Sequence, residues 1–552
     1  MTTAREPSRP RRGVLPSLAL SLVLAAACGG PPPPADGDGP PGTPRPETGG
    51  EMVIAGAAEP QDLNCLRAAD SPSVSLCRII SGTLLDYDKD LRIVPRLARS
   101  FEASPDGLTI TFHLRDDVRW HDGKPFTSRD VVYTVGKIRD PESAIRGNLP
   151  ALFGPIESVE APDDTTVVVR YREPYALAYQ AWTRAFIMPA HLPFGAGEET
   201  PLSRNPVGTG PFRFVRWEPG VQIVMEANPG YFDGRPHLDR LIYRVVPDRH
   251  SIVVGLETGD LDVAGLNPLE APPPDPSLPF EIIHYPAPML DFILWNTREK
   301  PGLFVDARVR RAFSLAFDRK GYIDHVTEGQ DIPAVSTFLP TVWAHDPNIA
   351  PLPYDPAAAA RLLAEAGWKD RDGDGILDTP AGPASFTLLF YSGLPVAEKI
   401  ATLVKESLEP LGVRVGLQGL DFPSLRERVR GHSFDAAVYR WTMDVDPDPY
   451  DFFHSSQAES GQNYGGYSNP EVDRLSEEGR RTLDLAGRAA IYHDLEKILR
   501  EEQPYTFISH PTTALAVSRR LRGIEVGPRG FWGWYPAPLR WWIPTDQRRR
   551  HE

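Results

Sequence analysis

The sequence predicts an α/β or α+β protein with more than one domain, and three observations support this fold class. The chain has 552 residues, more than a single hydrophobic core usually holds. Hydrophobic residues make up 41% of it and charged residues 24%, as in folded water-soluble chains. Strand-like and helix-like segments are mixed along the chain, with no repeat of fixed period.

Short apolar or alternating runs bounded by turn residues predict the strands. These runs are residues 109–114, 166–171, 221–226, 241–246, 386–391 and 434–439. Helical periodicity occurs between them, and one helix has a clear start where the cap residue Asp355 directly precedes Pro356. The predicted helices are residues 128–138, 306–317, 356–366, 396–408 and, in two pieces, 470–500.

The first segment of the chain predicts export. Residues 1–13 carry four arginines and one glutamate, and an apolar run follows at residues 14–27. The run is shorter than the roughly 20 residues that a membrane-spanning helix needs, so we interpret residues 1–27 as a cleaved signal peptide. Residues 25–29 read AAACG, which resembles the lipobox of bacterial lipoproteins, although Ala25 stands where that motif prefers Leu. The resemblance implies lipidation of Cys28, and ordinary signal-peptide cleavage is the alternative.

Residues 28–50 are predicted to be a tether behind the lipidated cysteine. The twenty residues 31–50 contain eight prolines and five glycines, a composition that favours extended chain over a folded core. We therefore expect the protein in the cell envelope, anchored to the membrane by lipid, in the periplasm or on the outer face of the cytoplasmic membrane.

Two further cysteines, Cys65 and Cys77, remain in the exported chain. A metal site normally has more closely spaced cysteine pairs and further ligands nearby, so a disulfide between the two is the favoured interpretation.

Composition and motifs exclude several functions. The net charge of −15, from 59 basic and 74 acidic residues, argues against nucleic acid as a partner. No G-x-S-x-G, H-E-x-x-H or phosphate-binding loop motif occurs, so we expect no catalysis and no cofactor.

The densest cluster of charge lies in residues 441–453, WTMDVDPDPYDFF. Four carboxylates fall within eight residues there, prolines prevent a regular helix, and aromatic residues flank them. Such a loop can bind a cation through charge-assisted hydrogen bonds and aromatic contacts. The alternative is a solvated acidic turn whose aspartates cap neighbouring helices.

Residues 370–381 show part of a calcium-loop pattern. Four aspartates and one glycine stand at the expected positions, but Ala381 replaces the bidentate glutamate, so any calcium site here would be weak. The alternative is a glycine-rich turn between a helix and a strand. The candidate ligands are Asp370, Asp372, Asp374 and Asp378.

Residues 112–135, FHLRDDVRWHDGKPFTSRDVVYTV, resemble the family 5 extracellular solute-binding proteins of ABC importers, whose members bind dipeptides, oligopeptides or nickel. Further segments match the family and follow one another in the same order as in its members. Together the matches extend over roughly residues 51–545. They are residues 208–233, 256–263, 306–319, 362–375 and 463–475.

The resemblance implies a class II periplasmic-binding-protein-like fold, with two α/β lobes around a central ligand cleft and a small additional α+β domain. Hinge closure of the lobes would bury the ligand. The family pattern assigns lobe one to residues 51–92, 207–294 and 508–545, the extra domain to 93–206, lobe two to 295–507 and a basic tail to 546–552.

The resemblance also implies a ligand site. In peptide-binding relatives the Asp of a W-x-x-D segment receives the α-ammonium group of the ligand, and the segment from Trp441 to Asp444 is similar to it. We therefore expect Asp444, Trp441, Thr442 and Met443 to bind the ligand, and Asp446 with less support from the spacing. His454 is the one nearby candidate for a nickel ligand.

The resulting hypothesis is a monomer that captures a peptide or a similar cationic solute and delivers it to an ABC permease and ATPase complex. The alternatives on the same scaffold are a binder of oligosaccharide or of a nickel or other metal chelate, an exported hydrolase, and a chaperone-like lipoprotein.

Overall fold

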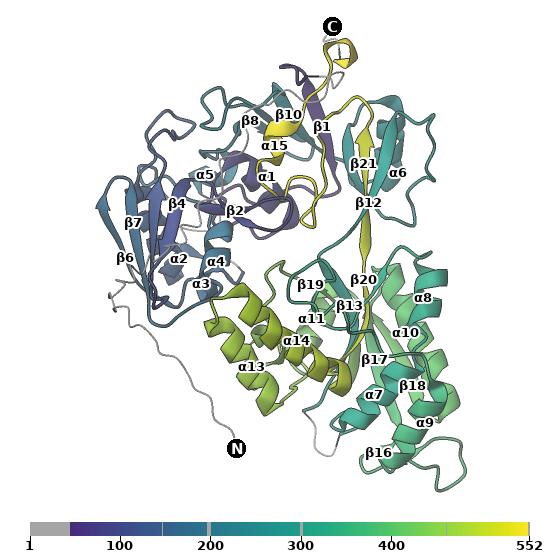
Figure 1. Cartoon of the computed structure of the whole chain (residues 1–552). Coiled ribbons are helices and arrows are strands. Elements are labelled where there is room, and N and C mark those ends of the chain that lie inside the picture. Colours follow the sequence, from purple (N-terminus) through teal and green to yellow (C-terminus); the bar gives the residue numbers. More distant parts are fainter. Residues whose placement is uncertain (1–44, 146, 196–199, 299–301, 460, 550–552) are drawn as a thin grey trace, which may run out of the picture. The chain divides into compact units, whose positions relative to one another are not determined.

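Three main β-sheets organise the chain in the computed structural model (Figure 1). The structure describes residues 45–145, 147–195, 200–298, 302–459 and 461–549, so the predicted signal peptide, Cys28 and most of the tether lie outside the described residues. Within these ranges, no helix is both long and apolar enough to cross a membrane.

The first sheet has seven strands in the order β12-β21-β11-β1-β10-β9-β8. β1 pairs in parallel with β10 and β11, and the remaining pairings are antiparallel. Apolar residues of α1 and α6 belong to two separate clusters that also contain strand residues, so both faces of the sheet are covered. The elements are β1 (Glu51–Gly56), α1 (Ser71–Ile80), β8 (Phe212–Glu218), β9 (Gln222–Ala227), β10 (Arg240–Val245), α6 (Arg249–Thr258), β11 (Val263–Leu266), β12 (Phe280–Pro286), β21 (Thr512–Ser518) and α15 (Ala537–Arg540).

The second sheet has six strands in the order β14-β20-β13-β19-β17-β18. Helices α7 to α10 contribute to the core on one face, and α11, α13 and α14 contribute to the core on the other. The strands are β13 (Met289–Trp295), β14 (Ile332–Pro333), β17 (Ser385–Tyr391), β18 (Arg414–Leu420), β19 (Ala436–Thr442) and β20 (Tyr505–His510). The helices are α7 (Ala307–Ala316), α8 (Arg319–Val326), α9 (Pro356–Glu365), α10 (Pro395–Leu408), α11 (Phe422–Arg430), α12 (Tyr450–Phe453), α13 (Pro470–Arg481) and α14 (Leu485–Glu502).

The third sheet is antiparallel, with the strand order β4-β5-β7-β6. Its core contains Trp120, Phe126 and Trp182, so the 112–135 motif serves the packing of this sheet and its helices. The elements are β4 (Ala98–Ala103), β5 (Thr109–Leu114), α2 (Ser128–Arg139), α3 (Leu149–Leu152), β6 (Ile156–Asp163), β7 (Thr166–Tyr171), α4 (Ala178–Arg184) and α5 (Pro201–Arg204). Two small ribbons pair β2 (Leu85–Tyr87) with β3 (Ile93–Pro95) and β15 (Asp378–Thr379) with β16 (Gly382–Pro383).

The chain crosses between the two large sheets at β12–β13 and again at β20–β21 (Figure 1). The crossings are adjacent, because the Ala287 amide donates a 2.8 Å hydrogen bond to the Pro511 carbonyl. Residues 289–294 belong to β13 and residues 508–510 to β20, and both strands lie in the six-stranded sheet. Pairing between β13 and β20 thus sets where the chain crosses.

Each predicted strand and helix corresponds to an element of the structure. β5 and β7 have the predicted limits, and the other elements differ by a few residues at their ends. Asp355 caps α9 as predicted, with its carboxylate accepting a 2.8 Å hydrogen bond from the Ala358 amide.

The structure joins Cys65 and Cys77 in a disulfide whose Cα atoms are 5.4 Å apart. Both cysteines are buried and pack with Phe186. The bond therefore connects the segment after β1 to the buried face of α1.

Candidate ligand-binding site

A cavity of about 770 Å³ lies between α3, α4, α13 and the loop that follows β19. Its volume falls in the range of about 300–1,000 Å³ that is typical of small-molecule sites. The acidic loop 442–452 forms one wall, and the opposite wall includes Leu152, Gln180 and Arg184. The cavity therefore joins residues of the four-stranded and six-stranded sheet regions.

The acidic loop begins where β19 ends at Thr442. The Met443 amide donates a 2.7 Å hydrogen bond to the Pro288 carbonyl, which fixes the start of the loop. Pro447 and Pro449 lack amide donors and oppose regular structure, so the loop stays irregular until α12.

Asp444 is the most accessible carboxylate of this loop. Its side chain is 47% exposed and lines the cavity. The Arg184 Nη1 atom lies 2.9 and 3.1 Å from its two oxygens. Because both side chains reach solvent, this ion pair is of the weak, exchangeable kind.

Asp446 lies behind the cavity wall and not in its lining. Its side chain is 11% exposed, and Oδ1 accepts a 2.8 Å hydrogen bond from Nη1 of Arg488. The Gln180 side chain donates to its main-chain carbonyl at 3.0 Å. Burial raises the pKa of Asp446 to about 6, and the positive charge of Arg488 opposes this shift. Asp446 is therefore engaged in an internal ion pair beneath the cavity lining.

Asp448 and Asp451 share Arg480 of α13. The Arg480 Nε atom lies 2.8 Å from Asp448, and its Nη2 atom lies 2.9 Å from Asp451. Its guanidinium also stacks 3.7 Å from the centre of the Tyr450 ring. Burial acts to lower the pKa of Arg480, but the carboxylates of Asp448 and Asp451 outweigh it and raise the pKa. Three aspartates of the loop are thus paired with arginines of α13 and α14, whereas Asp444 pairs with Arg184 of α4.

The charges in the cavity lining favour a cation. Five carboxylates and three guanidinium groups line it, which leaves an excess of two negative charges. A partly desolvated carboxylate binds an ammonium group through a charge-assisted hydrogen bond. The lining residues with charge are Glu173, Asp444, Asp448, Asp451, Glu477, Arg184, Arg480 and Arg481.

The other expected site residues are divided between the cavity and the core beneath it. Thr442 and Met443 line the cavity together with Asp444. Trp441 instead packs against the rings of neighbouring aromatic residues and supports the loop from below. His454 is buried, with Nδ1 2.8 Å from the Ser456 hydroxyl and Nε2 3.4 Å from a Glu477 oxygen.

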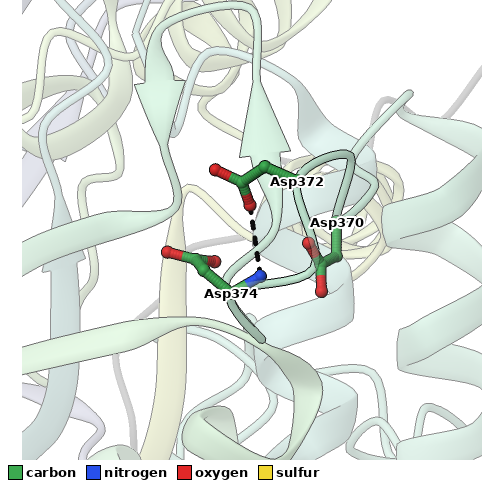
Figure 2. A group of neighbouring side chains, drawn as sticks. All are labelled: Asp370, Asp372 and Asp374. Carbon is green, nitrogen blue, oxygen red and sulfur yellow. Dashed lines mark hydrogen bonds between the residues drawn. The ribbon is translucent and has the colours of Figure 1, made fainter.

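Three residues of the calcium-type loop lie together, as Figure 2 shows for Asp370, Asp372 and Asp374. All three are exposed, and their carboxylates accept hydrogen bonds from main-chain amides of the same loop. Asp378 accepts a 2.9 Å hydrogen bond from the Arg371 amide. Gly373 has a φ of 82°, in the left-handed region that favours glycine. These bonds close a turn between α9 and β15.

The opposite wall of the cavity was not predicted. Arg184 and Asp444 are 260 positions apart in the sequence, and Gln180 and Asp446 are 266 apart. Neither α3 nor α4 carries a motif that marks a ligand contact, so only the packing of the third sheet reveals their role.

Three main sheets with helices packed on them and a charged cavity between two of the sheet regions are what a ligand-binding protein requires. The family model described as bacterial extracellular solute-binding proteins, family 5, matches residues 92–464. The oligopeptide-binding protein AppA of Bacillus subtilis (strain 168) is 32% identical over 495 residues, which cover 88% of this chain and 90% of that protein. The chain belongs to the family 5 extracellular solute-binding proteins.

Solved structures agree with this assignment. AppA from Bacillus subtilis in complex with a nonapeptide gives a TM-score of 0.75 at 30% identity, covering 91% of this chain and 100% of that one. The ABC transporter substrate-binding protein CtaP from Listeria monocytogenes gives 0.79 at 25% identity, covering 90% and 100%. NikZ from Campylobacter jejuni in complex with Ni(L-His) gives 0.76 at 25% identity, covering 89% and 99%. The protein is thus a substrate-binding protein of an ABC importer and not an enzyme.

Proposed function

We propose that this protein captures peptides in the cavity beside Asp444 and delivers them to its membrane permease. AppA, whose structure holds a nonapeptide, supports the choice of ligand class. The observation that carries the proposal is the accessible carboxylate of Asp444 in a cavity with an excess of negative charge.

The α-ammonium group of the peptide would take the place of Arg184 at Asp444. An exposed ion pair contributes about 0–1 kcal/mol, so breaking it costs little. A charged hydrogen bond that is shielded by the bound ligand contributes about 1.5–3 kcal/mol. The exchange therefore favours a ligand with a free amino terminus.

Hinge motion would then enclose the ligand. We assign lobe one to the seven-stranded sheet, lobe two to the six-stranded sheet and the extra domain to the four-stranded sheet. The adjacent crossings near Ala287 and Pro511 are the expected hinge, since few main-chain angles need to change there. A ligand that contacts both sides would favour the closed form.

The amino-terminal segment supports a lipid-anchored form. Residues 1–27 have the pattern of a signal peptide, and Cys28 follows a lipobox-like sequence. The tether that ends at residue 50 would let the folded part of the protein extend away from the membrane. An anchor of this kind would keep the binding protein close to its permease and ATPase complex.

Nickel is a weaker candidate ligand. Among the residues that the structure describes, the cavity lining includes no histidine or cysteine, and His454 is engaged by Ser456 and Glu477. Imidazole and thiolate are the ligands that transition metals prefer in proteins.

Titration calorimetry of the processed chain with a set of short peptides tests the proposal. We expect saturable binding of free-amine peptides, and mass spectrometry should find the peptides intact afterwards. Binding of an oligosaccharide or a nickel chelate in place of every peptide would contradict the proposed ligand class, and cleaved peptide would contradict a pure binding role.

A further inference from the structure

A second, much smaller cavity lies in the region of the seven-stranded sheet and shares no lining residue with the larger one. The end of α1, the β2–β3 ribbon and residues 532–539 meet around it. Its volume is about 10 Å³, which is room for one group of about the size of a water molecule. Among the prolines and aromatic rings of its lining stand the polar side chains of Arg78, Asp86, Arg96 and Tyr231.

Arginines outnumber carboxylates at this second cavity. One oxygen of Asp86 accepts a 3.1 Å hydrogen bond from the Arg96 Nη1 atom, and the other lies 3.6 Å from the Arg529 Nη1 atom. No hydrogen bond or ion pair within the described ranges engages the Arg78 guanidinium. Three guanidinium groups therefore have one carboxylate among them.

The neighbouring charges reduce this excess but do not remove it. Asp233 acts electrostatically on Arg96, but its ion pair, at 3.3 Å, is with Arg115. Arg115 also pairs with Asp117 at 2.8 Å. Counted together with the groups at the cavity, four guanidinium groups face three carboxylates, so one negative charge would balance them.

Two of the lining residues keep a buried polar atom that no described residue satisfies. Arg96 is 4% exposed and uses its Nη atoms for Asp86 and the Ser81 carbonyl, whereas its Nε atom has no hydrogen-bond partner. Tyr231 is 5% exposed, and its hydroxyl group has no partner either. Burial raises the pKa of Tyr231 to about 12, and the charge of Arg96 opposes this shift, so the hydroxyl keeps its proton near neutral pH and can donate it. Unsatisfied buried donors are costly, and a bound water molecule or ion commonly accounts for them.

The charge of the cavity decides between a water molecule and an ion. Water would accept the hydrogen bonds but would leave the excess positive charge in place. Burial, followed by the positive charge of Arg529, lowers the pKa of Arg78 to about 9, so Arg78 still carries its charge near neutral pH. An anion nearby favours the charged form of such a group, and buried charges are normally paired. The small volume excludes sulfate, phosphate and carboxylate groups, which leaves a monatomic anion.

We propose that the second cavity is an anion site that holds one chloride ion between Arg78, Arg96 and Tyr231. The arginines supply positive charge and N–H donors, and the tyrosine supplies an O–H donor. The site does not depend on the proposed function, because its residues lie outside the peptide cavity. The ion connects α1 to the carboxy-terminal segment that contains Trp532 and Tyr535, so its binding stabilises the folded chain.

Bromide gives a direct test, because it substitutes for chloride and is located by its anomalous X-ray scattering. In crystals of the processed chain soaked in sodium bromide, we expect an anomalous peak inside the second cavity, in contact with Arg78 and Tyr231. The absence of a peak from this cavity overturns the proposal and assigns the unsatisfied donors to water.

Thermal unfolding tests whether the ion also binds in solution. The melting temperature, Tm, is measured in mixtures of sodium chloride and sodium gluconate at constant ionic strength, because gluconate is too large for the cavity. Raising chloride from about 1 to about 200 mM should raise the Tm of the wild type by at least about 1 °C, as for a ligand that binds only the folded state. A bromide peak without any chloride dependence of the Tm would show binding at crystal concentration only, and would overturn the proposal as well.

Two variants of the site identify the residues that hold the ion. Arg78→Gln and Tyr231→Phe should each lose at least half of the chloride-dependent rise in Tm, because each removes a donor. Arg216→Gln, an exposed arginine paired with Glu218, should keep all of it and controls for general effects of salt. If Arg78→Gln does not fold, Tyr231→Phe decides, since it removes a single oxygen atom. A rise in both variants equal to that of the wild type overturns the site.

Discussion

At the scale of single residues, the aspartates of the acidic loop differ in how far their side chains are exposed. The side chains of Asp446 and Asp448 are 11% and 15% exposed and are paired with arginines of α13 and α14. Asp444 is 47% exposed, and its partner Arg184 comes from α4. Burial makes the inner pairs costly to break, whereas the Asp444–Arg184 pair can be exchanged for a ligand. We therefore regard Arg184 as a competitor of the ligand at Asp444.

Replacing Arg184 tests this competition. Arg184→Gln removes the internal cation from Asp444, so we expect the affinity for a free-amine peptide to rise by up to about fivefold, equivalent to about 1 kcal/mol. Titration calorimetry measures the change, and Arg481→Gln, a neighbouring lining residue, provides the matched control. A loss of tenfold or more in Arg184→Gln would show instead that Arg184 contacts the ligand directly.

At the scale of elements, the disulfide fixes the segment after β1 onto α1. It closes a loop with a sequence separation of 12, and both cysteines lie in the interior. Cross-linking a loop of about this length stabilises a protein by roughly 2–4 kcal/mol, chiefly by restricting the unfolded chain. The bond therefore supports α1, whose apolar face packs in the core of the seven-stranded sheet.

The double variant Cys65→Ser, Cys77→Ser should lose about 2–4 kcal/mol of unfolding free energy in urea. Wild-type protein unfolded under a reducing agent should show the same loss, and adding the reductant to the double variant should change nothing. Equal midpoints for the oxidised wild type and the double variant would contradict a stabilising role for the bond.

At the scale of the whole molecule, the folded part that contains the cavity is separate from the amino-terminal segment that we expect to attach it to the membrane. The three sheets and the cavity all lie in the described residues, whereas the predicted signal peptide, Cys28 and most of the predicted tether lie outside them. We expect Cys28 alone to hold the protein at the membrane, through the segment that precedes β1.

Cys28→Ser tests that attachment. Without the thiol no lipid can be added, so the variant should move from the membrane fraction to the soluble fraction of the cell envelope. Immunoblotting of fractionated cells measures the distribution, and Cys65→Ser controls for loss of a cysteine elsewhere. A Cys28→Ser protein that stays with the membrane would contradict the lipid anchor.

Local features of this fold could be predicted from the sequence, and long-range ones could not. The alternating pattern of β5 and β7 and the cap at Asp355 are local signals, and the structure contains them as expected. The position of the crossing before β13 depends on pairing with β19 and β20, which no local pattern marks. Similarly, the loop 441–453 indicated where the acidic groups lie, but not that Arg184 would face them from 260 residues away.

The central claim is that Asp444 receives the ammonium group of a peptide, and one set of titrations tests it most directly. Calorimetry compares the wild type and Asp444→Asn with one peptide in free-amine and N-acetylated forms, and Asp494→Asn on α14 serves as a control for a lost surface charge. We predict that Asp444→Asn weakens binding of the free-amine peptide by about 1.5–3 kcal/mol and leaves the acetylated peptide unaffected. An equal loss for both peptides, or no loss for either, would contradict the claim.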